Sequence, residues 1–217
     1  SIGYNAYSLY KTGADEYGNK FPLSIRSFDD YKPALYVYLD ILPIALFGLN
    51  EFALRLPAAI FGVLTVIAVY FLTKEILPKA VSLIAAFFFA ISPWHLQFSR
   101  AAFEGNIGLF FFINGLLFFL KALRNGNFFY LSSILFLLSL YSYHSFRLFV
   151  PLFLLALLVI FWRGVLNFKK QAIISMLILF FFSFPIWNSF LGTATGTGAR
   201  LSMVTIFSDP TVIDDSI

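Results

Sequence analysis

A short polar segment, Ser92–Asn106, separates two apolar runs and carries His95, Arg100, Glu104 and Asn106. Arg100 and Glu104 are four residues apart, so on a helical turn they would share one face and could pair. Because a charged pair at the edge of a membrane is costly unless it is used or satisfied, the segment is a candidate functional site. The alternative is an ordinary interfacial loop in which the arginine and the glutamate neutralise each other.

A second polar segment ends in Lys32, which follows Asp29, Asp30 and Tyr31 and directly precedes a proline-led apolar run. This order predicts that Lys32 lies at the membrane surface, at the height of the lipid phosphate groups. A lysine there is a natural point-charge partner for a phosphate oxygen. The alternative is a lysine whose aliphatic stem follows apolar surface and merely carries its charge to the interface.

Two further segments carry polar side chains toward the C-terminus. The run Tyr141–Arg147 places Tyr143, His144 and Arg147 between two apolar stretches. A histidine in such a place is either a ligand or base, or a satisfied interfacial residue. The Gly- and Thr-rich run 192–210 lacks the Gly-Lys-Ser/Thr ending of a phosphate-binding P-loop, so we expect it to be the flexible start of an external loop or domain.

The composition defines the class of protein that holds these segments. Of its 217 residues, 60% are hydrophobic, 12% are charged and 30 are phenylalanine, which is more than a soluble domain of this size could keep off its surface. The chain is therefore predicted to be a polytopic membrane protein. It contains no cysteine, which excludes disulfides, thiolate metal sites and a cysteine nucleophile. Nothing in the sequence resembles a nucleic-acid surface, a Ser-His-Asp triad or a haem attachment site.

The predicted fold is all-α, a transmembrane helical bundle with an external N-terminal loop that contains juxtamembrane helices. The run Ala34–Gly48 is apolar but short, and Asp40 and Pro43 interrupt it, which favours a re-entrant or interfacial segment over a span. The chain divides into an external region, a six-helix transmembrane region and the start of another external loop, at residues 1–53, 54–190 and 191–217. The six predicted spans cover residues 54–73, 80–94, 107–122, 128–143, 148–162 and 171–190.

The charge of the short loops predicts the orientation of the bundle. Alternate loops hold seven basic residues against one acid, Glu75. The basic residues are Lys74, Lys79, Lys121, Arg124, Arg163, Lys169 and Lys170. The positive-inside rule makes these loops cytoplasmic. The other side holds eight of the 15 basic residues but ten of the 11 acids, and all four polar segments lie there.

An acidic outer face with a few fixed cations at headgroup height suits a substrate that is lipid-anchored and phosphorylated. Acids would activate an acceptor or bind a divalent ion, while Lys and Arg would hold the phosphate that leaves. A lipid-linked saccharide transporter would use the same outer charges but would more often bury polar residues near mid-membrane. A non-catalytic membrane subunit would explain the apolar bulk, but not the co-occurrence of Lys32, Arg100, Glu104 and Arg147.

Four runs of the chain together carry a resemblance to a known superfamily: DEYGNKFPLSIRSFDDYKPALYVYL, FGLNEFALRLPAAIFG, SPWHLQFSRAAFEGN and YSYHSFRLFVPLF. They resemble bacterial membrane glycosyltransferases of the protein O-mannosyltransferase and aminoarabinose-transferase superfamily, which has the GT-C fold and includes glycosyltransferase family 39. The Lys-Pro-x-Leu-Tyr signature at Lys32 and the Arg-Leu-Pro-x-Ala signature at Arg55–Ala59 are specific in this order. The resemblance implies transfer of a sugar from a polyprenyl-phosphate donor to an acceptor, by an inverting single displacement, on the outer face of the bacterial plasma membrane.

The resemblance also implies roles for individual residues. Glu104 matches the second acidic position of the family, and Lys32 matches the lysine that contacts the donor phosphate. The residues expected to hold the donor phosphate are Lys32, Arg100 and Arg147, and those expected to contact substrate are Tyr31, Asn106, Tyr143 and His144. In the aminoarabinose transferases an acid adjoins the phosphate-binding lysine and helps to hold a metal. Tyr31 occupies that place here, so the resemblance leaves a divalent metal ion open.

The family's main acidic pair is an Asp-Glu pair in the first external loop, whose Asp acts as a base or activates the acceptor. In similar sequences the pair lies just upstream of a segment like SIGYNAY, with which this chain begins. We therefore expect the pair to precede Ser1 and the chain to be a fragment that is open at both ends. Asp15, in the pair Asp15-Glu16, is the less favoured equivalent.

Overall fold

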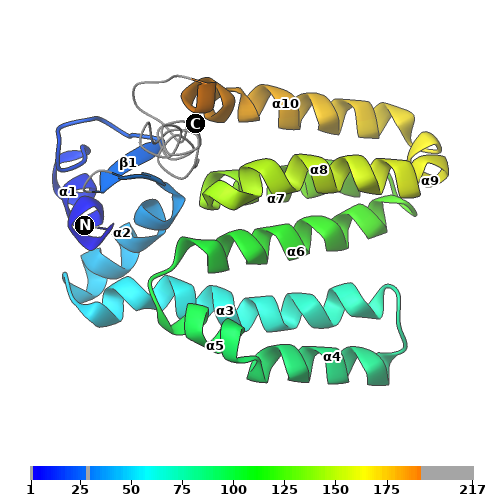
Figure 1. The fold of residues 1–217 in the computed structure, drawn as a ribbon, viewed down its shortest axis with the longest axis horizontal. Coiled ribbons are helices and arrows are strands. Elements are labelled where there is room, and N and C mark those ends of the chain that lie inside the picture. The colour runs from blue at the N-terminus through cyan, green and yellow to red at the C-terminus, as the bar shows by residue number, and fades with distance from the viewer. Residues whose placement is uncertain (1, 28–29, 192–217) are drawn as a thin grey trace, which may run out of the picture.

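The computed structural model describes residues 2–27 and 30–191, which form a helical bundle with a smaller layer at one end (Figure 1). The bundle helices are α3 (Glu51–Lys74), α4 (Lys79–Ile91), α6 (Glu104–Ala122), α7 (Phe128–Ser142), α8 (His144–Ile160) and α10 (Lys169–Leu191). They lie alongside one another, with α4 at one edge of the view and α10 at the other. The predicted all-α transmembrane-type fold is confirmed, with one short hairpin added.

The smaller layer, which we call the end layer, is formed by the N-terminal part of the chain. Its elements are α1 (Ile2–Thr12), β1 (Ser24–Ser27), β2 (Asp30–Pro33) and α2 (Leu35–Phe47). The two strands pair antiparallel, with Ile25 opposite Lys32. Gly13 and Gly18 have φ angles of +71° and +86°, a conformation that favours glycine, and they lie in the turns that follow α1.

The chain passes from the end layer into the bundle through a short turn. Gly48, with a φ of +79°, ends α2. The Asn50 side chain then accepts a hydrogen bond from the backbone nitrogen of Ala53 at 2.8 Å, which caps the first turn of α3. As a result α2 stays beside α1 at the end of the bundle (Figure 1). This position is consistent with the predicted re-entrant or interfacial segment.

The six predicted spans correspond to six helices, but their lengths differ. Within the described residues α3, α6 and α10 are each long and apolar enough to cross a membrane. Helix α4 and the short α5 (Pro93–Arg100) pass the same test together, although the chain bends by 56° between them. Helices α7 and α8 have 15 and 17 residues, or about 22–26 Å, which is less than a ~30 Å hydrocarbon core.

Helices α6 and α7 pack closely because small residues face each other across their interface. A Cβ at Gly115 would lie only 3.0 Å from the ring of Phe136. Ser132 Oγ donates a hydrogen bond to the backbone oxygen of Gly115 at 2.8 Å, and Ser139 Oγ donates one to that of Gly108 at 3.0 Å. Small residues and interhelical serine bonds are typical of helix packing in membranes.

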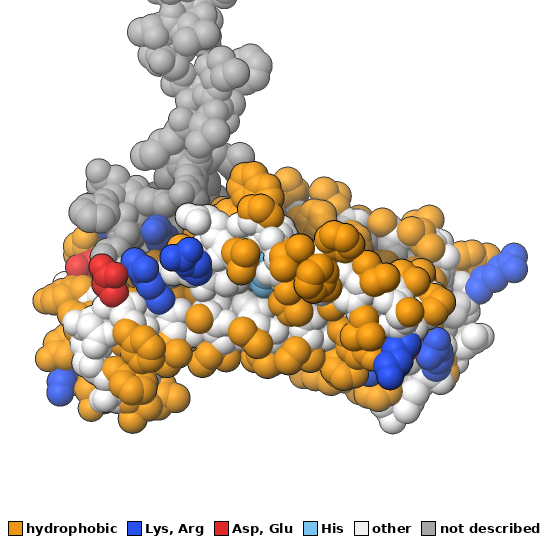
Figure 2. Space-filling model, turned by 90° about the horizontal axis from the view of Figure 1, so that it is seen from below, with side chains coloured by type: hydrophobic (Ala, Val, Ile, Leu, Met, Phe, Trp, Pro, Cys, Tyr) orange, Lys and Arg blue, Asp and Glu red, His pale blue; other side chains and the backbone are white. Residues whose placement is uncertain are grey.

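Charged side chains gather at the two ends of the molecule, with hydrophobic side chains along its length (Figure 2). The end opposite the end layer, which we call the far end, contains the loops α3–α4, α6–α7 and α8–α10. The seven basic residues that the sequence places in cytoplasmic loops all lie in these loops or at the adjoining helix ends. At the far end Arg124 Nη1 lies 3.0 Å from Glu75 Oε2.

Candidate active site

A hydrogen bond links the end layer to the bundle across a large separation in sequence. Nε2 of His144, the first residue of α8, lies 2.7 Å from the backbone oxygen of Tyr31 on β2. Because a carbonyl oxygen can only accept, Nε2 is the nitrogen that carries the hydrogen. The contact holds the strand that contains Lys32 against the start of α8.

Arg147 belongs to the same junction. It lies three residues after His144, so both side chains leave α8 on the same side. Its side chain is buried, with 7% of the residue exposed, whereas Tyr31 and Lys32 are half-buried. The structure therefore brings together the two segments that carry four of the predicted donor and substrate residues, where β2 meets α8.

Glu104 begins α6 on the inner side of the end layer and is only 7% exposed. It lies near Tyr36 of α2, whose hydroxyl donates a hydrogen bond to the backbone oxygen of Leu54 at 2.8 Å. Burial raises the pKa of Tyr36, and the negative charges of Asp40 and then Glu104 raise it further. Two carboxylates thus lie close to one buried phenol.

Asp40 is an acidic residue that the sequence did not suggest as part of a site. It is fully buried on α2, and neither of its carboxylate oxygens has a hydrogen-bond partner among the described residues. Burial raises its pKa to about 8, so the side chain is largely protonated at neutral pH. The available signal was an acidic residue inside an apolar run, which by itself indicates only that the run is not an ordinary span.

The expected helical turn that would pair Arg100 with Glu104 is wrong. Arg100 is the last residue of α5, Ala101 is extended with φ −94° and ψ 152°, and Glu104 starts a new helix. Arg100 is exposed and makes no salt bridge within the described part of the chain. The extended Ala101 interrupts the helix between the two residues, so the four-residue spacing does not bring the two charges onto one helix face.

Asp15 has a structural role in a turn after α1. Its Oδ1 accepts hydrogen bonds from the backbone nitrogens of Tyr17 and Asn19 at 2.9 and 2.8 Å, and its Oδ2 accepts one from Asn19 Nδ2 at 2.9 Å. Such side-chain bonds stabilise the turn that leads toward the hairpin. The neighbouring Glu16 accepts a hydrogen bond from Asn5 Nδ2 at 2.9 Å. Asp29 lies outside the described residues.

The central segment is anchored on α3 by two backbone contacts. His95 Nε2 lies 3.1 Å from the backbone oxygen of Gly62, and Asn106 Nδ2 donates to that of Ala58 at 2.8 Å. The close approach needs a glycine, since a Cβ at Gly62 would overlap the Ser99 side chain. Burial lowers the pKa of His95, so its ring is neutral at physiological pH.

A cavity of about 500 Å³ opens beside this anchor. Its walls come from the end of α4, from α5, from the start of α6 and from the start of α8. Both His95 and Asn106 line it, as does the predicted substrate residue Tyr143. The Tyr143 ring lies 5.4 Å from that of Phe103, the residue before Glu104, so the cavity adjoins the site residues on α6 and α8.

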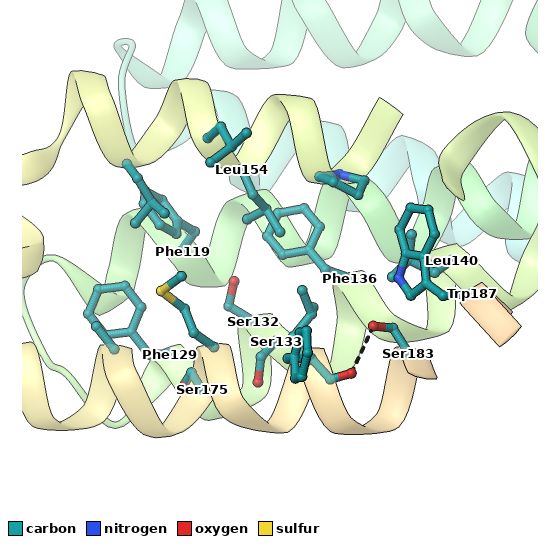
Figure 3. Close-up of a pocket in the computed structure, with 17 residues that line it drawn as sticks. Phe119, Phe129, Ser132, Ser133, Phe136, Leu140, Leu154, Ser175, Ser183 and Trp187 are labelled. Carbon is teal, nitrogen blue, oxygen red and sulfur yellow. Dashed lines mark hydrogen bonds between the residues drawn. The ribbon is translucent and has the colours of Figure 1, made fainter. Parts of the chain in front are cut away.

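A second cavity, of about 470 Å³, lies among α6, α7, α8 and α10 in the bundle (Figure 3). Its lining is almost entirely apolar, with a few serines. Three of these donate to backbone oxygens: Ser132 to Gly115, Ser133 to Tyr130 and Ser183 to Phe180. No charged side chain is among its described lining residues, so we do not assign chemistry to it.

No three His, Asp or Glu side chains of the described ranges are grouped as ligands for a metal ion. The position next to Lys32 is a tyrosine, and a neutral phenol is a poor ligand for a hard divalent cation. The described residues therefore do not form a metal site, and no step of the chemistry is assigned to a metal.

The fold and these residues define a polytopic membrane protein with a polar site at one end of its bundle. A family model described as dolichyl-phosphate-mannose-protein mannosyltransferase matches residues 31–187. The match covers well over half of the chain, so the chain belongs to this family of membrane glycosyltransferases. No curated protein and no solved structure matches it. The family assignment confirms the resemblance recognised in the sequence.

Proposed function

We propose that the protein transfers a sugar from a polyprenyl-phosphate donor to an acceptor at the end-layer face of the bundle. The observation that carries the proposal is the hydrogen bond from His144 to the Tyr31 backbone, which brings Lys32 and Arg147 to one junction. Two cations held at the end of an apolar bundle suit a phosphate on a lipid. The family membership supports a lipid-linked sugar donor.

In the proposed reaction an acceptor oxygen attacks the anomeric carbon of the sugar. The bond between that carbon and the donor phosphate oxygen breaks, and its electron pair stays on the phosphate. Lys32 and Arg147 stabilise the charge that develops on the leaving phosphate. Glu104 receives the acceptor proton, because it is the acidic residue of the predicted site that lies buried at the start of α6, beside Tyr36 of the end layer.

The end layer is proposed to face the outside of the cell. The support is the group of seven basic residues at the far end, which the positive-inside rule assigns to the cytoplasm. The chain has no native cysteine, so single cysteines can report sidedness. An impermeant maleimide should label Lys20→Cys in intact cells and Lys170→Cys only after permeabilisation; the reverse pattern would invert the proposed orientation.

The experiment that tests the function measures transfer of radiolabelled mannose from polyprenyl phosphate in membranes that contain the full-length protein. Lys32→Ala should lower transfer about 100-fold, since it removes a charge that stabilises the leaving phosphate. Lys121→Ala, at the far end, is the matched control and should keep full transfer. Equal activity of both variants would remove Lys32 from the site. Absence of transfer together with movement of labelled lipid across the bilayer would indicate a transporter instead.

A further inference from the structure

The cavity between α4, α5, α6 and α8 contains two buried hydrogen-bond acceptors that the proposed chemistry does not use. His95 is 7% exposed and Asn106 is 3% exposed, and both line the cavity. His95 Nδ1 and Asn106 Oδ1 have no hydrogen-bond partner among the described residues. A buried polar atom without a partner is destabilising, so a ligand that supplies the missing bonds would be favoured here.

The backbone contacts on α3 determine what these two atoms can do. Gly62 and Ala58 present carbonyl oxygens, which can only accept, so His95 Nε2 and Asn106 Nδ2 must be the donors. The neutral His95 ring then has a lone pair on Nδ1, and the Asn106 amide has its oxygen, Oδ1, free to accept. Both atoms therefore require a donor, and a ligand that fits them must carry at least two O–H or N–H groups.

The rest of the lining is aromatic and uncharged. Phe98 and Phe103 are stacked, with ring centroids 4.7 Å apart, and Trp94 continues the stack beyond Phe98 at 6.1 Å. None of the described lining residues is Asp, Glu, Lys or Arg. An anionic phosphate would find no counter-charge in this cavity, and a plain hydrocarbon chain would leave both acceptors without a partner.

We propose that this cavity binds a sugar ring whose hydroxyl groups donate hydrogen bonds to His95 and Asn106 while its C–H groups contact the aromatic wall that includes Phe98 and Phe103. An apolar cavity with a few convergent polar groups, about 300–1,000 Å³ in volume, is the usual form of a small-molecule site, and the cavity has about 500 Å³. The choice of a sugar rests on the proposed function. The ring is that of the lipid-linked donor or of a saccharide acceptor.

The test measures equilibrium binding of three probes to the purified full-length protein in a detergent without sugar groups. The probes are citronellyl phosphate, citronellyl-phosphate mannose and methyl α-mannoside. Phe98→Leu removes a stacking ring, and His95→Phe removes an acceptor but keeps an aromatic ring beside Phe89. Phe87→Leu is the control, because Phe87 is exposed on α4 and does not line the cavity. Melting temperatures establish that each variant is folded.

Both cavity variants should weaken binding of citronellyl-phosphate mannose about five- to tenfold, the effect of losing one hydrogen bond or ring contact. Binding of citronellyl phosphate and the behaviour of Phe87→Leu should not change. If only methyl α-mannoside binds more weakly, the ring is that of an acceptor.

Unchanged binding of both mannose-bearing probes would overturn the assignment of a sugar site. Equal weakening of citronellyl phosphate would also overturn it, because the cavity would then hold the isoprenoid chain. The outcome is separable from that of the transfer experiment. A protein that lacks transfer but binds mannose through Phe98 would contradict the proposed function and leave the sugar site standing.

Discussion

The two ends of the helical bundle differ in how far their charged groups are exposed to solvent. At the far end the basic side chains remain in contact with solvent, and even Arg124, which pairs with Glu75, has a side chain that is 73% exposed. At the other end Asp40, Glu104 and Arg147 are all less than a tenth exposed. Exposed ion pairs contribute little to stability, whereas buried ionisable groups are costly.

This difference separates two uses of charge in one membrane protein. The proposed orientation rests on the number of solvent-exposed cations at the far end, so we expect each of them to be individually dispensable. Buried groups beneath the end layer lower stability unless they are satisfied by other groups or by a ligand. We therefore expect substitutions at the far end to leave function unchanged and similar substitutions beneath the end layer to abolish it.

The largest expected effect comes from the same substitution made at both ends. Glu104→Gln removes the proposed general base and should lower mannose transfer about 100-fold or more. Glu75→Gln removes only the partner of an exposed arginine and should leave transfer unchanged. Labelled mannose transferred per unit of protein in membranes measures both. A Glu104→Gln variant with more than half of the wild-type rate would remove Glu104 from the reaction.

A smaller effect is expected where α5 packs on α3. Gly62→Ala places a methyl group against Ser99, which should push α5 away and weaken the His95 contact with the Gly62 oxygen. Overpacking of this kind lowers the free energy of unfolding by about 1–3 kcal/mol, so the melting temperature should fall. The rate of mannose transfer should also fall, by about tenfold, because an increase of about 1.4 kcal/mol in the activation free energy lowers a rate by that factor.

Gly164→Ala at the far end provides the control for that substitution. The nearest atom to a Cβ there is 3.1 Å away, at the end of the flexible Leu123 side chain, and alanine is the better helix former. Its melting temperature should stay the same or rise. Equal losses in the two variants would show that the close contact at Gly62 has no special importance.

The third expected effect is a dependence of stability on pH. The pKa of Asp40 rises on folding from 3.8 to about 8. The contribution of this carboxyl group to the free energy of unfolding is therefore complete below about pH 4 and is lost as the pH rises through 8. The melting temperature in detergent should therefore fall between pH 6 and pH 9. Asp40→Asn should remove that part of the slope and melt higher than the wild type at pH 9.

Glu51→Gln is the matched control for Asp40, because Glu51 is exposed on α3 and pairs with Arg55 at 3.1 Å. It should keep the pH dependence of the wild type. An Asp40→Asn variant with an unchanged slope would show that the carboxyl group is not buried as the structure has it.

Much of the fold could be predicted from the sequence because membrane helices follow a simple rule. Long apolar runs separated by short basic loops identify the bundle helices within a few residues, as at α6 and α10. The hairpin of β1 and β2 was not predicted, since four-residue strands leave little periodic signal. The polar segment that begins at Ser92 coincides with the bend between α4 and α5, but the predicted span continued to Trp94 and α5 was not predicted.

The candidate site was less predictable because it depends on contacts between distant segments. Lys32 and Arg147 were named from their positions at the ends of apolar runs, and the structure brings their segments together through His144. His144 and Tyr31 are 113 residues apart in the chain, and no pattern in the sequence predicts that the His144 ring nitrogen contacts the Tyr31 carbonyl oxygen. Burial of Asp40 and the unused acceptors of His95 and Asn106 likewise arise only after helices pack.

The most direct test of where the donor binds is photocrosslinking of the full-length protein with a farnesyl phosphate that carries a diazirine near its phosphate. Digestion and mass spectrometry then locate the adducts. We predict adducts within residues 22–40 and 141–150, where β2 meets α8, and their loss in competition with unlabelled polyprenyl phosphate. Adducts confined to residues 74–79 or 121–127 would place the lipid phosphate at the far end and contradict the proposed donor site.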